Sequence, residues 1–197
     1  MNKNRLIRTI IILVLGLGIA AAIAAYQISN EKKPHMVSEN FGGPFTLTNQ
    51  NGETVTQEDF ENEYRLIYFG FTYCPAICPT ELQKISTALN ELGDKGDDIT
   101  PVFITVDPER DTVDVMRQYV ELFHPNMVGL TGTIEQIEQA KKSYKIYAAK
   151  VKDDTMSDYT MDHSSFIYFI DNQNNLLRIF KVDDTAEDIT RYINGVL

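Results

Sequence analysis

Short apolar runs alternate along the chain with stretches in which apolar residues recur at the helical period. Leu66–Phe71, Val102–Val106 and Phe166–Ile170 are apolar almost throughout, as expected of strands covered on both faces. Helical periodicity follows from about Thr80 to Gly93, from Asp111 to Phe123, from Ile134 to about Tyr144, and from Ile189 to Val196. This order of elements predicts an α/β fold with a mixed central sheet.

The remaining extended segments are shorter and lie beside turn residues. Phe45–Val55 has the pattern of a hairpin around an Asn51-Gly52 turn. Leu176–Val182 follows the turn-rich segment Asp171–Asn175 and is expected to pair with the strand before it. Further extended segments are expected at Val128–Leu130 and Ile146–Ala148.

The N-terminal pattern differs from the rest. Three basic residues lie within the first eight positions, and no charge appears from Thr9 to Asn30. The apolar core, Ile10–Ala25, is long enough to cross most of a bilayer of roughly 30 Å as a helix. With its basic flank in the cytoplasm, this segment predicts a single-pass transmembrane anchor in the cell (inner) membrane. The alternative is a cleaved signal peptide, since Ala20–Ala25 offers small residues to a peptidase.

The charge balance bears on the partners of the exported part. Residues 1–30 form the basic flank and anchor, residues 31–42 a polar tether, and residues 43–197 one domain on the extracytoplasmic side. The net charge is −10, and all 28 acidic residues follow the anchor. This balance argues against nucleic acid as a partner. Export also implies an oxidising compartment, in which a close cysteine pair tends towards a disulfide.

Cys74 and Cys78 are the only cysteines in the sequence. They follow the Leu66–Phe71 run, at the carboxyl end of a buried strand, where ligands bind in such sheets. Pro79 suits the first position of the next helix, which would place Cys78 near the helix N-cap, where N–H groups favour a thiolate. The pair can form a structural disulfide, act as a redox pair, or hold a soft metal. A reactive pair is favoured, because closing so short a loop adds little stability.

His163 is the histidine with the best position for a metal ligand. It stands in the segment Tyr159–Ser165, just before the Phe166–Ile170 strand, and that loop can lie beside the cysteine loop. Two thiolates and one imidazole suit copper, as Cu(I) through the sulfurs and as Cu(II) with the imidazole. A structural zinc site would need a fourth protein ligand, and none is evident. The alternative is a loop histidine held by hydrogen bonds.

Asp107 follows the Val102–Val106 strand and is expected at the same end of the sheet. It is predicted to orient a ligand or to form a hydrogen bond near the site. The alternative is structural, with Asp111 capping the next helix and Arg110 pairing with an acid. Weaker candidates for the site are His35, His124, Met156 and Met161, and the acidic pairs Asp153-Asp154 and Asp183-Asp184 are expected to be solvated.

Three segments together resemble a known family. Tyr68–Thr80, Phe103–Asp111 and Asp162–Ser164 are similar, in this order, to motifs of the Sco/SenC family. The resemblance covers roughly residues 41–197, together with the N-terminal segment. It implies a thioredoxin-like fold and delivery of copper to the dinuclear Cu-A centre of cytochrome c oxidase, or reduction of the cysteines of that centre.

The resemblance also implies a site. The copper ligands of the family fall on Cys74, Cys78 and His163, and the implied partners are the oxidase subunit that carries Cu-A and an upstream copper donor or thiol reductant. One departure is Ala76, since members often have an acidic residue between the cysteines. The change removes a charge close to the site but no ligand.

Two functions therefore follow as hypotheses. The first is a membrane-anchored copper-binding assembly factor, a metallochaperone rather than a turnover enzyme. The second is a thiol–disulfide oxidoreductase, which needs Cys74 and Cys78 but not His163. Against the second, the segment before the Phe166–Ile170 strand has no proline, whereas thioredoxin-like oxidoreductases usually carry a cis-proline there. A redox or copper sensor is a third, weaker hypothesis.

Overall fold

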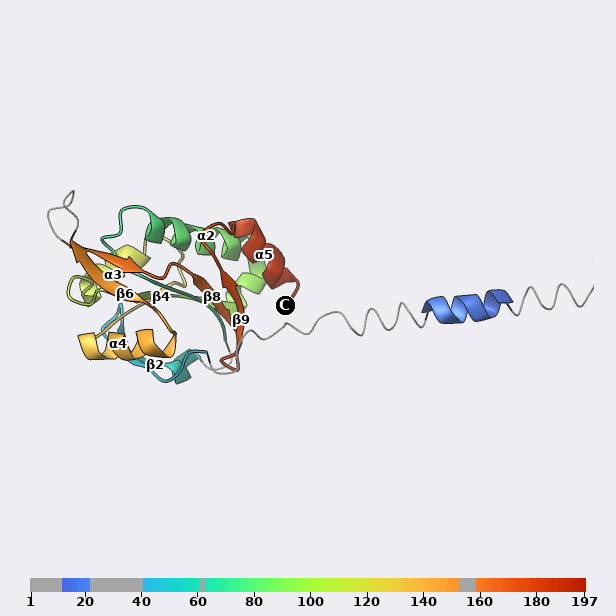
Figure 1. Cartoon of the computed structure of the whole chain (residues 1–197), viewed down its shortest axis with the longest axis horizontal. Coiled ribbons are helices and arrows are strands. Elements are labelled where there is room, and N and C mark those ends of the chain that lie inside the picture. Colours follow the sequence, from blue (N-terminus) through green and yellow to red (C-terminus); the bar gives the residue numbers. More distant parts are fainter. Residues whose placement is uncertain (1–11, 22–40, 61–62, 153–158) are drawn as a thin grey trace, which may run out of the picture. The chain divides into compact units, whose positions relative to one another are not determined.

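The structure is a computed structural model that describes residues 12–21, 41–60, 63–152 and 159–197 (Figure 1). The chain divides into two units, residues 1–35 and 36–197. In the first unit, residues 12–21 are helical. Within the described ranges, no helix is both long and apolar enough to cross a membrane. The remainder of the predicted anchor, most of the tether, and the candidates His35, Met156 and Asp153-Asp154 lie outside the described residues.

A seven-stranded mixed sheet forms the centre of the second unit, as predicted. Its order is β2-β1-β5-β4-β3-β8-β9. β3 runs parallel to β4, and β4 to β5, whereas the other pairs are antiparallel. The bounds are β1 Thr46–Asn49, β2 Thr54–Thr56, β3 Tyr64–Gly70, β4 Ile99–Thr105, β5 Val128–Thr131, β8 Ile167–Ile170 and β9 Leu176–Phe180.

Helices cover both faces of this sheet. Figure 1 shows α2 and α5 side by side on one face and α4 on the other. The α-helices are α2 Ile77–Leu92, α3 Val113–Val120, α4 Ile134–Ser143 and α5 Ala186–Asn194, and two 3₁₀ helices are η1 Gln57–Phe60 and η2 Gly93–Asp98. The four predicted helices are thereby confirmed.

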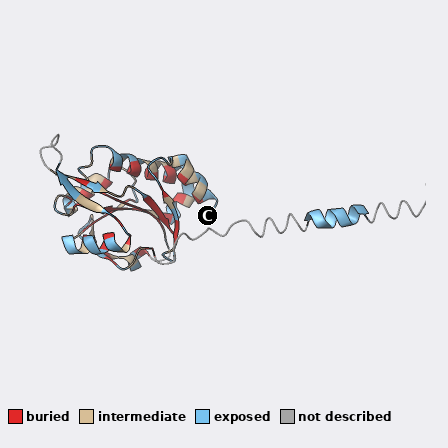
Figure 2. Ribbon diagram, in the orientation of Figure 1, coloured by how far each residue is buried: buried red, intermediate tan, exposed pale blue. Residues whose placement is uncertain are grey.

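The core is built from the two faces of the central strands. Tyr68 of β3 stacks beside Phe103 of β4, with ring centroids 6.4 Å apart, whereas the next residue, Phe69, packs against Tyr144 at the end of α4. Alternate side chains of one strand thus enter opposite halves of the core. Figure 2 shows the buried residues gathered on the sheet and on the helix surfaces that face it.

The start of α2 differs from the prediction. The helix begins at Ile77, so Cys78 is its second residue and Pro79 its third, and Ala76 occupies the N-cap. Proline is tolerated there because the first N–H groups of a helix have no intrahelical partner. Cys78 therefore lies near the N-cap, as predicted, but Pro79 occupies the third helical position and not the first.

A two-stranded sheet stands apart from the central one. It pairs β6 (Ala148–Lys152) antiparallel with β7 (Tyr159–His163), and Ala148 lies opposite His163. The sequence pattern marked Ile146–Ala148 as extended but treated Tyr159–Ser165 as a loop. That interpretation was wrong, since His163 is the last residue of a strand.

The predicted helix cap at Asp111 is also wrong. Thr112 is the N-cap of α3, and its hydroxyl accepts from the N–H of Val115. Asp111 is fully buried, and its carboxylate accepts from the backbone N–H and hydroxyl of Thr72 and from the hydroxyl of Thr105. Asp111 thus fastens the cysteine loop to the end of β4.

Replacement of Asp111 by alanine is expected to lower the free energy of unfolding by about 3 kcal/mol, because several buried donors lose their acceptor. Asp114→Ala is the matched control: Asp114 is exposed on α3 and pairs only with Arg117, so its loss should cost less than about 0.5 kcal/mol. Urea unfolding of the full chain measures both values. Equal losses for the two variants would contradict the role assigned to Asp111.

Candidate metal and redox site

The cysteine loop connects β3 to α2 at the carboxyl end of the parallel strands. Cys78 is fully buried in the first turn of α2, whereas Cys74 is half-buried, and both are free thiols. The backbone N–H of Cys78 donates to the sulfur of Cys74 at 3.3 Å. Ala76 at the N-cap has no side chain that can accept this hydrogen bond. The sulfur of Cys74 therefore takes the place of a capping oxygen at the start of α2.

The two sulfurs differ in protonation. A hydrogen bond from the Cys78 side chain, opposed by partial burial, lowers the pKa of Cys74 to about 4, with further contributions from His163 and from backbone N–H groups. The same hydrogen bond, together with burial, raises the pKa of Cys78. At neutral pH the pair thus holds one thiolate, on Cys74, and one thiol, on Cys78. The sequence-based expectation placed the stabilised thiolate on Cys78; in the structure the N–H at the helix N-terminus donates to Cys74 instead, and the largest contribution to the lowered pKa of Cys74 is the hydrogen bond from the Cys78 side chain.

His163 approaches the buried sulfur from a different element. Its Nε2 lies 3.5 Å from the Sγ of Cys78, and its Nδ1 lies 3.0 Å from the carbonyl oxygen of Ser164. Because a carbonyl can only accept, Nδ1 donates to it, and Nε2 is the ring nitrogen that faces the sulfur. The ring also meets Phe71 edge-on, with centroids 5.7 Å apart. The structure thus brings His163 to the cysteine loop, as the sequence predicted.

Tyr68 and Gly70 complete the pocket of the buried thiol. The sequence did not mark either residue as part of the site. The hydroxyl of Tyr68 lies 3.8 Å from the Sγ of Cys78. A Cβ at Gly70 would come within 2.9 Å of the same sulfur, so only glycine at this position leaves room for Cys78. Both residues were visible in the motif before Cys74, but nothing in their spacing marked a contact with a residue eight to ten positions away.

The donor set fits a soft metal. Metal–sulfur and metal–nitrogen bonds of about 2.3 and 2.0 Å, at angles between tetrahedral and trigonal, put the two donors roughly 3.5 to 3.7 Å apart. The contact between Cys78 and His163 has this length. Among the described side chains, no cluster of three or more His, Cys, Asp or Glu already has the arrangement of a metal site. A metal held by both sulfurs and the imidazole would replace the proton of the Cys78 thiol.

Asp107 lies beside the site without touching the predicted ligands. Its buried carboxylate accepts from the hydroxyl of Tyr159 at 2.8 Å and from the Nε of Arg110 at 2.5 Å. The acid partner predicted for Arg110 is thereby found. Of the weaker candidates, Met161 is buried next to α4, and the Nδ1 of His124 accepts from the N–H of Asn126 in a turn.

The fold and the site define a class of protein: an α/β domain of thioredoxin-like architecture with a thiolate, a thiol and an imidazole at the carboxyl end of its central strands. The chain belongs to the SCO1/SenC family, whose model matches residues 20–197. It is 40% identical to a SCO2-like protein of Rickettsia prowazekii over 95% of each chain.

Solved structures agree with this assignment. The chain is similar to Bradyrhizobium japonicum ScoI with copper bound, with 40% identity and a TM-score of 0.73 over 80% of this chain and 99% of that one. It is also similar to Arabidopsis thaliana ScoI with copper bound, with 38% identity and a TM-score of 0.75 over 79% and 98% of the two chains.

The difference between the two sulfurs is testable by alkylation. A lowered pKa means that the thiolate of Cys74 is present above that pKa and is lost only as the pH falls through it. Iodoacetamide should therefore label Cys74 at a nearly constant rate from pH 5.5 to 8. The labelling rate of an ordinary thiol with a pKa of about 8.5 rises roughly tenfold per pH unit over the same range. Mass spectrometry of the native, reduced chain should find one label, since Cys78 is buried.

Cys78→Ala serves as the control because it removes the side chain that contributes most to the lowered pKa of Cys74. In this variant the labelling rate of Cys74 should become pH-dependent over the same range. A wild-type rate that already climbs tenfold per pH unit would contradict the thiolate assignment.

Proposed function

We propose that this protein is a membrane-anchored copper-binding assembly factor. It binds copper through Cys74, Cys78 and His163 and delivers it to the Cu-A centre of cytochrome c oxidase. The observation that carries the proposal is the 3.5 Å contact between His163 and Cys78, which joins an imidazole from a separate hairpin to a two-sulfur loop. A thiol–disulfide exchange protein needs the two sulfurs but has no use for that imidazole.

Relatives support both parts of the proposal. The structures of ScoI from Bradyrhizobium japonicum and Arabidopsis thaliana are described with copper bound. BsSco, 27% identical with a TM-score of 0.63, is described as a member of the Sco family of cytochrome c oxidase assembly proteins and as having a disulfide switch. Bound copper, cytochrome c oxidase assembly and a disulfide switch are thus each described for proteins similar to this one.

The protonation states suggest how copper is taken up. The Cys74 thiolate is the first donor to meet the ion, because it is half-exposed and already deprotonated. The Cys78 thiol then gives up its proton, so that one proton is released as the second sulfur binds. The cost of a buried thiolate at Cys78 is offset by the positive charge of the ion. If the pair is oxidised, both sulfurs are consumed in the disulfide and the loop binds no copper.

The N-terminal segment determines the location of the domain, and through it the need for a copper donor and a thiol reductant. The apolar run Ile10–Ala25 would hold the protein in the cell (inner) membrane as a single-pass anchor, with the domain on the extracytoplasmic side. Because that compartment is oxidising, the pair needs a thiol reductant as well as an upstream copper donor before each delivery.

The alternative function is that of a thiol–disulfide oxidoreductase that reduces the cysteines of the oxidase subunit. The lowered pKa of Cys74 favours it, since a thiolate is the attacking species in exchange. The segment between His163 and β8 is Ser164-Ser165-Phe166, and no described peptide bond is cis. The proline of oxidoreductases is therefore missing where a substrate disulfide would dock.

Copper titration of the reduced full chain in detergent separates the two functions. The wild type is expected to bind about one copper per chain, and the oxidised protein none. Cys74→Ser and Cys78→Ser should abolish tight binding, whereas His163→Ala should keep Cu(I) but lose the spectrum of thiolate-bound Cu(II). His124→Ala, a histidine in a turn away from the site, is the matched control.

The contradictory outcomes are distinct. An unchanged Cu(II) spectrum in His163→Ala would remove the three-ligand site. A wild-type chain that binds no copper, yet reduces a disulfide peptide of the oxidase subunit at the same rate with or without His163, would favour the oxidoreductase.

The anchor is testable in cells that express the full chain. The protein should stay with the membrane fraction after carbonate washing, and external protease should reach the domain in spheroplasts. Leu15→Arg places a charge in the apolar run and should release part of the protein, at a cost of about 3 kcal/mol on insertion. Recovery of a soluble chain whose N-terminus lies just after Ala20–Ala25 would instead identify a cleaved signal peptide.

A further inference from the structure

The hairpin β6–β7 carries His163 but is not hydrogen-bonded into the central sheet. The cysteines lie on another element, the loop between β3 and α2. Backbone hydrogen bonds within either sheet therefore do not set the distance between the imidazole and the sulfurs. That distance depends on the three-residue connection from His163 to β8 and on the side chains that hold the hairpin against the cysteine loop.

Three residues provide this attachment, and we name Asp107, Arg110 and Tyr159 the hairpin clamp. Asp107 is 1% exposed, and one of its carboxylate oxygens accepts from the Tyr159 hydroxyl at 2.8 Å, the other from the Nε of Arg110 at 2.5 Å. The Nη1 of Arg110 donates to the backbone carbonyl of Tyr159 at 2.9 Å. The guanidinium carbon lies 3.8 Å from the centre of the Tyr159 ring. The turn after β4 thus contacts the backbone carbonyl, the hydroxyl and the ring of Tyr159 on β7.

The same guanidinium also reaches the cysteine loop. Its carbon lies 4.9 Å from the ring centroid of Tyr73, the neighbour of Cys74, and 5.8 Å from that of Phe71. Phe71 in turn meets His163 edge-on at 5.7 Å. Arg110 therefore contacts β7 and the cysteine loop at once, and the Phe71 ring stands between the guanidinium and the imidazole. Each cation–π contact contributes about 0.5–2 kcal/mol.

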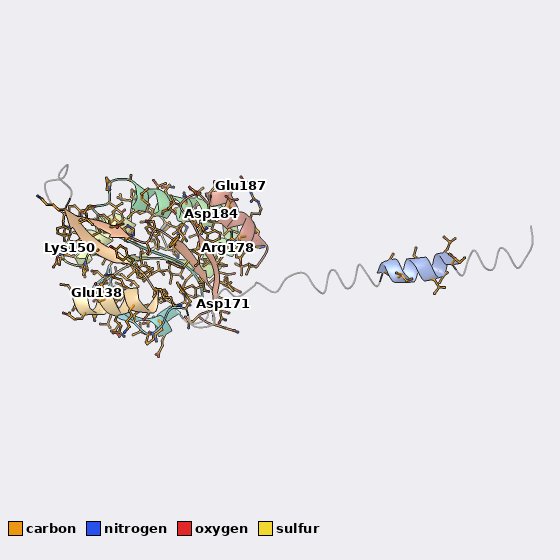
Figure 3. The ribbon with its side chains drawn as sticks, viewed as in Figure 1. Glu138, Lys150, Asp171, Arg178, Asp184 and Glu187 are labelled. Carbon is orange, nitrogen blue, oxygen red and sulfur yellow. The ribbon has the colours of Figure 1, made fainter. Side chains whose placement is uncertain are left out.

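A second ion pair lies at the rim of the clamp. Lys150 on β6 (Figure 3) pairs with Glu109, and its amine lies 4.5 Å from the centre of the Tyr159 ring. Both partners are nearly half-exposed, so this pair contributes at most about 1 kcal/mol. The buried contacts of Asp107 and Arg110 are the stronger part of the clamp.

We propose that the hairpin clamp sets the reach of His163 to the cysteine loop and thereby determines how strongly the site prefers Cu(II) over Cu(I). The inference rests on the proposed function, since it assigns a role in copper binding. The chemistry is asymmetric: two thiolates on one loop satisfy Cu(I), whereas Cu(II) also needs the imidazole. A looser hairpin therefore weakens the Cu(II) complex and leaves the Cu(I) complex nearly unchanged. The clamp residues are positioning residues, since the contacts described above join β7 to the turn after β4 and to the rings of the cysteine loop.

The test uses the full chain with two substitutions. Tyr159→Phe removes only the hydroxyl that binds Asp107. Arg110→Gln removes the guanidinium group, and with it the hydrogen bonds to Asp107 and to the Tyr159 carbonyl and the stacking on the Tyr159 ring. The Cu(II) dissociation constant should rise about tenfold or more in Arg110→Gln and less in Tyr159→Phe, with the Cu(I) constant changed by less than about threefold. A tenfold selective loss of Cu(II) binding raises the reduction potential of the bound copper by about 59 mV.

A measurement on the copper-free protein complements the titrations. In both variants the amide protons of β7 should exchange faster with solvent, and the NMR signals of the His163 ring should shift. The matched controls are Tyr64→Phe, at the opposite end of β3, and Arg191→Gln on α5, an exposed arginine that also pairs with carboxylates. Neither control should change the ratio of the Cu(II) and Cu(I) constants.

The inference fails if the clamp variants weaken Cu(II) and Cu(I) equally, or weaken neither, while the wild type binds both. Thermal unfolding identifies a variant that loses Cu(II) and Cu(I) binding merely because it is unstable. In that case the result for Tyr159→Phe, which removes a single oxygen atom, decides whether the inference holds. The proposed function fails separately, if the wild type binds no copper or if His163→Ala leaves Cu(II) binding intact.

Discussion

The hydrogen bond from the backbone N–H of Cys78 to the sulfur of Cys74 is the contact on which the chemistry of this protein depends. It exists because α2 begins at Ile77, two residues before a proline that has no N–H to offer. The N–H of Cys78 is thus one of the few donors at this helix end, and the sulfur four positions earlier in the sequence accepts from it. A spacing with three intervening residues lets the first sulfur fold back over the helix N-terminus, and this contact adds to the larger effect of the Cys78 side chain in making Cys74 the thiolate of the pair.

Burial gives the second sulfur the opposite character. Cys78 is enclosed by Tyr68, by the glycine at position 70 and by the imidazole of His163. Its thiol is costly to ionise in that environment unless a positive charge or a covalent bond to Cys74 replaces the proton. A soft metal ion and a disulfide are the two partners that meet this condition. Under the proposed function, the same pair binds copper when reduced and forms a disulfide when oxidised, so that the state of the pair decides whether copper can be held.

Much of this arrangement could be predicted from the sequence. The apolar runs located β3, β4 and β8, and the helical period located all four α-helices, because burial on one or two faces leaves a clear signal over several residues. The position of His163 beside the cysteine loop was predicted from residue type and place in the chain, and the structure confirms that proximity. The strand β7 was missed because its exposed face is polar and it depends on pairing with β6. The role of Asp111 was missed because its partner Thr72 is 39 residues away, and no local pattern reports such a contact. The membrane anchor stays a prediction.

Ala76 acquires a meaning from the structure that its sequence position did not suggest. As the N-cap residue of α2 it is placed where aspartate, asparagine or serine would normally accept from the second or third N–H of the helix. Here the third residue is Pro79, so the N–H of Cys78 is the one such donor left at this helix end. An acidic side chain at position 76, common between the cysteines of the family, would offer an oxygen to that N–H and compete with the sulfur of Cys74. With alanine the donor is left to the sulfur alone, which favours the thiolate of Cys74 without adding a second negative charge beside it.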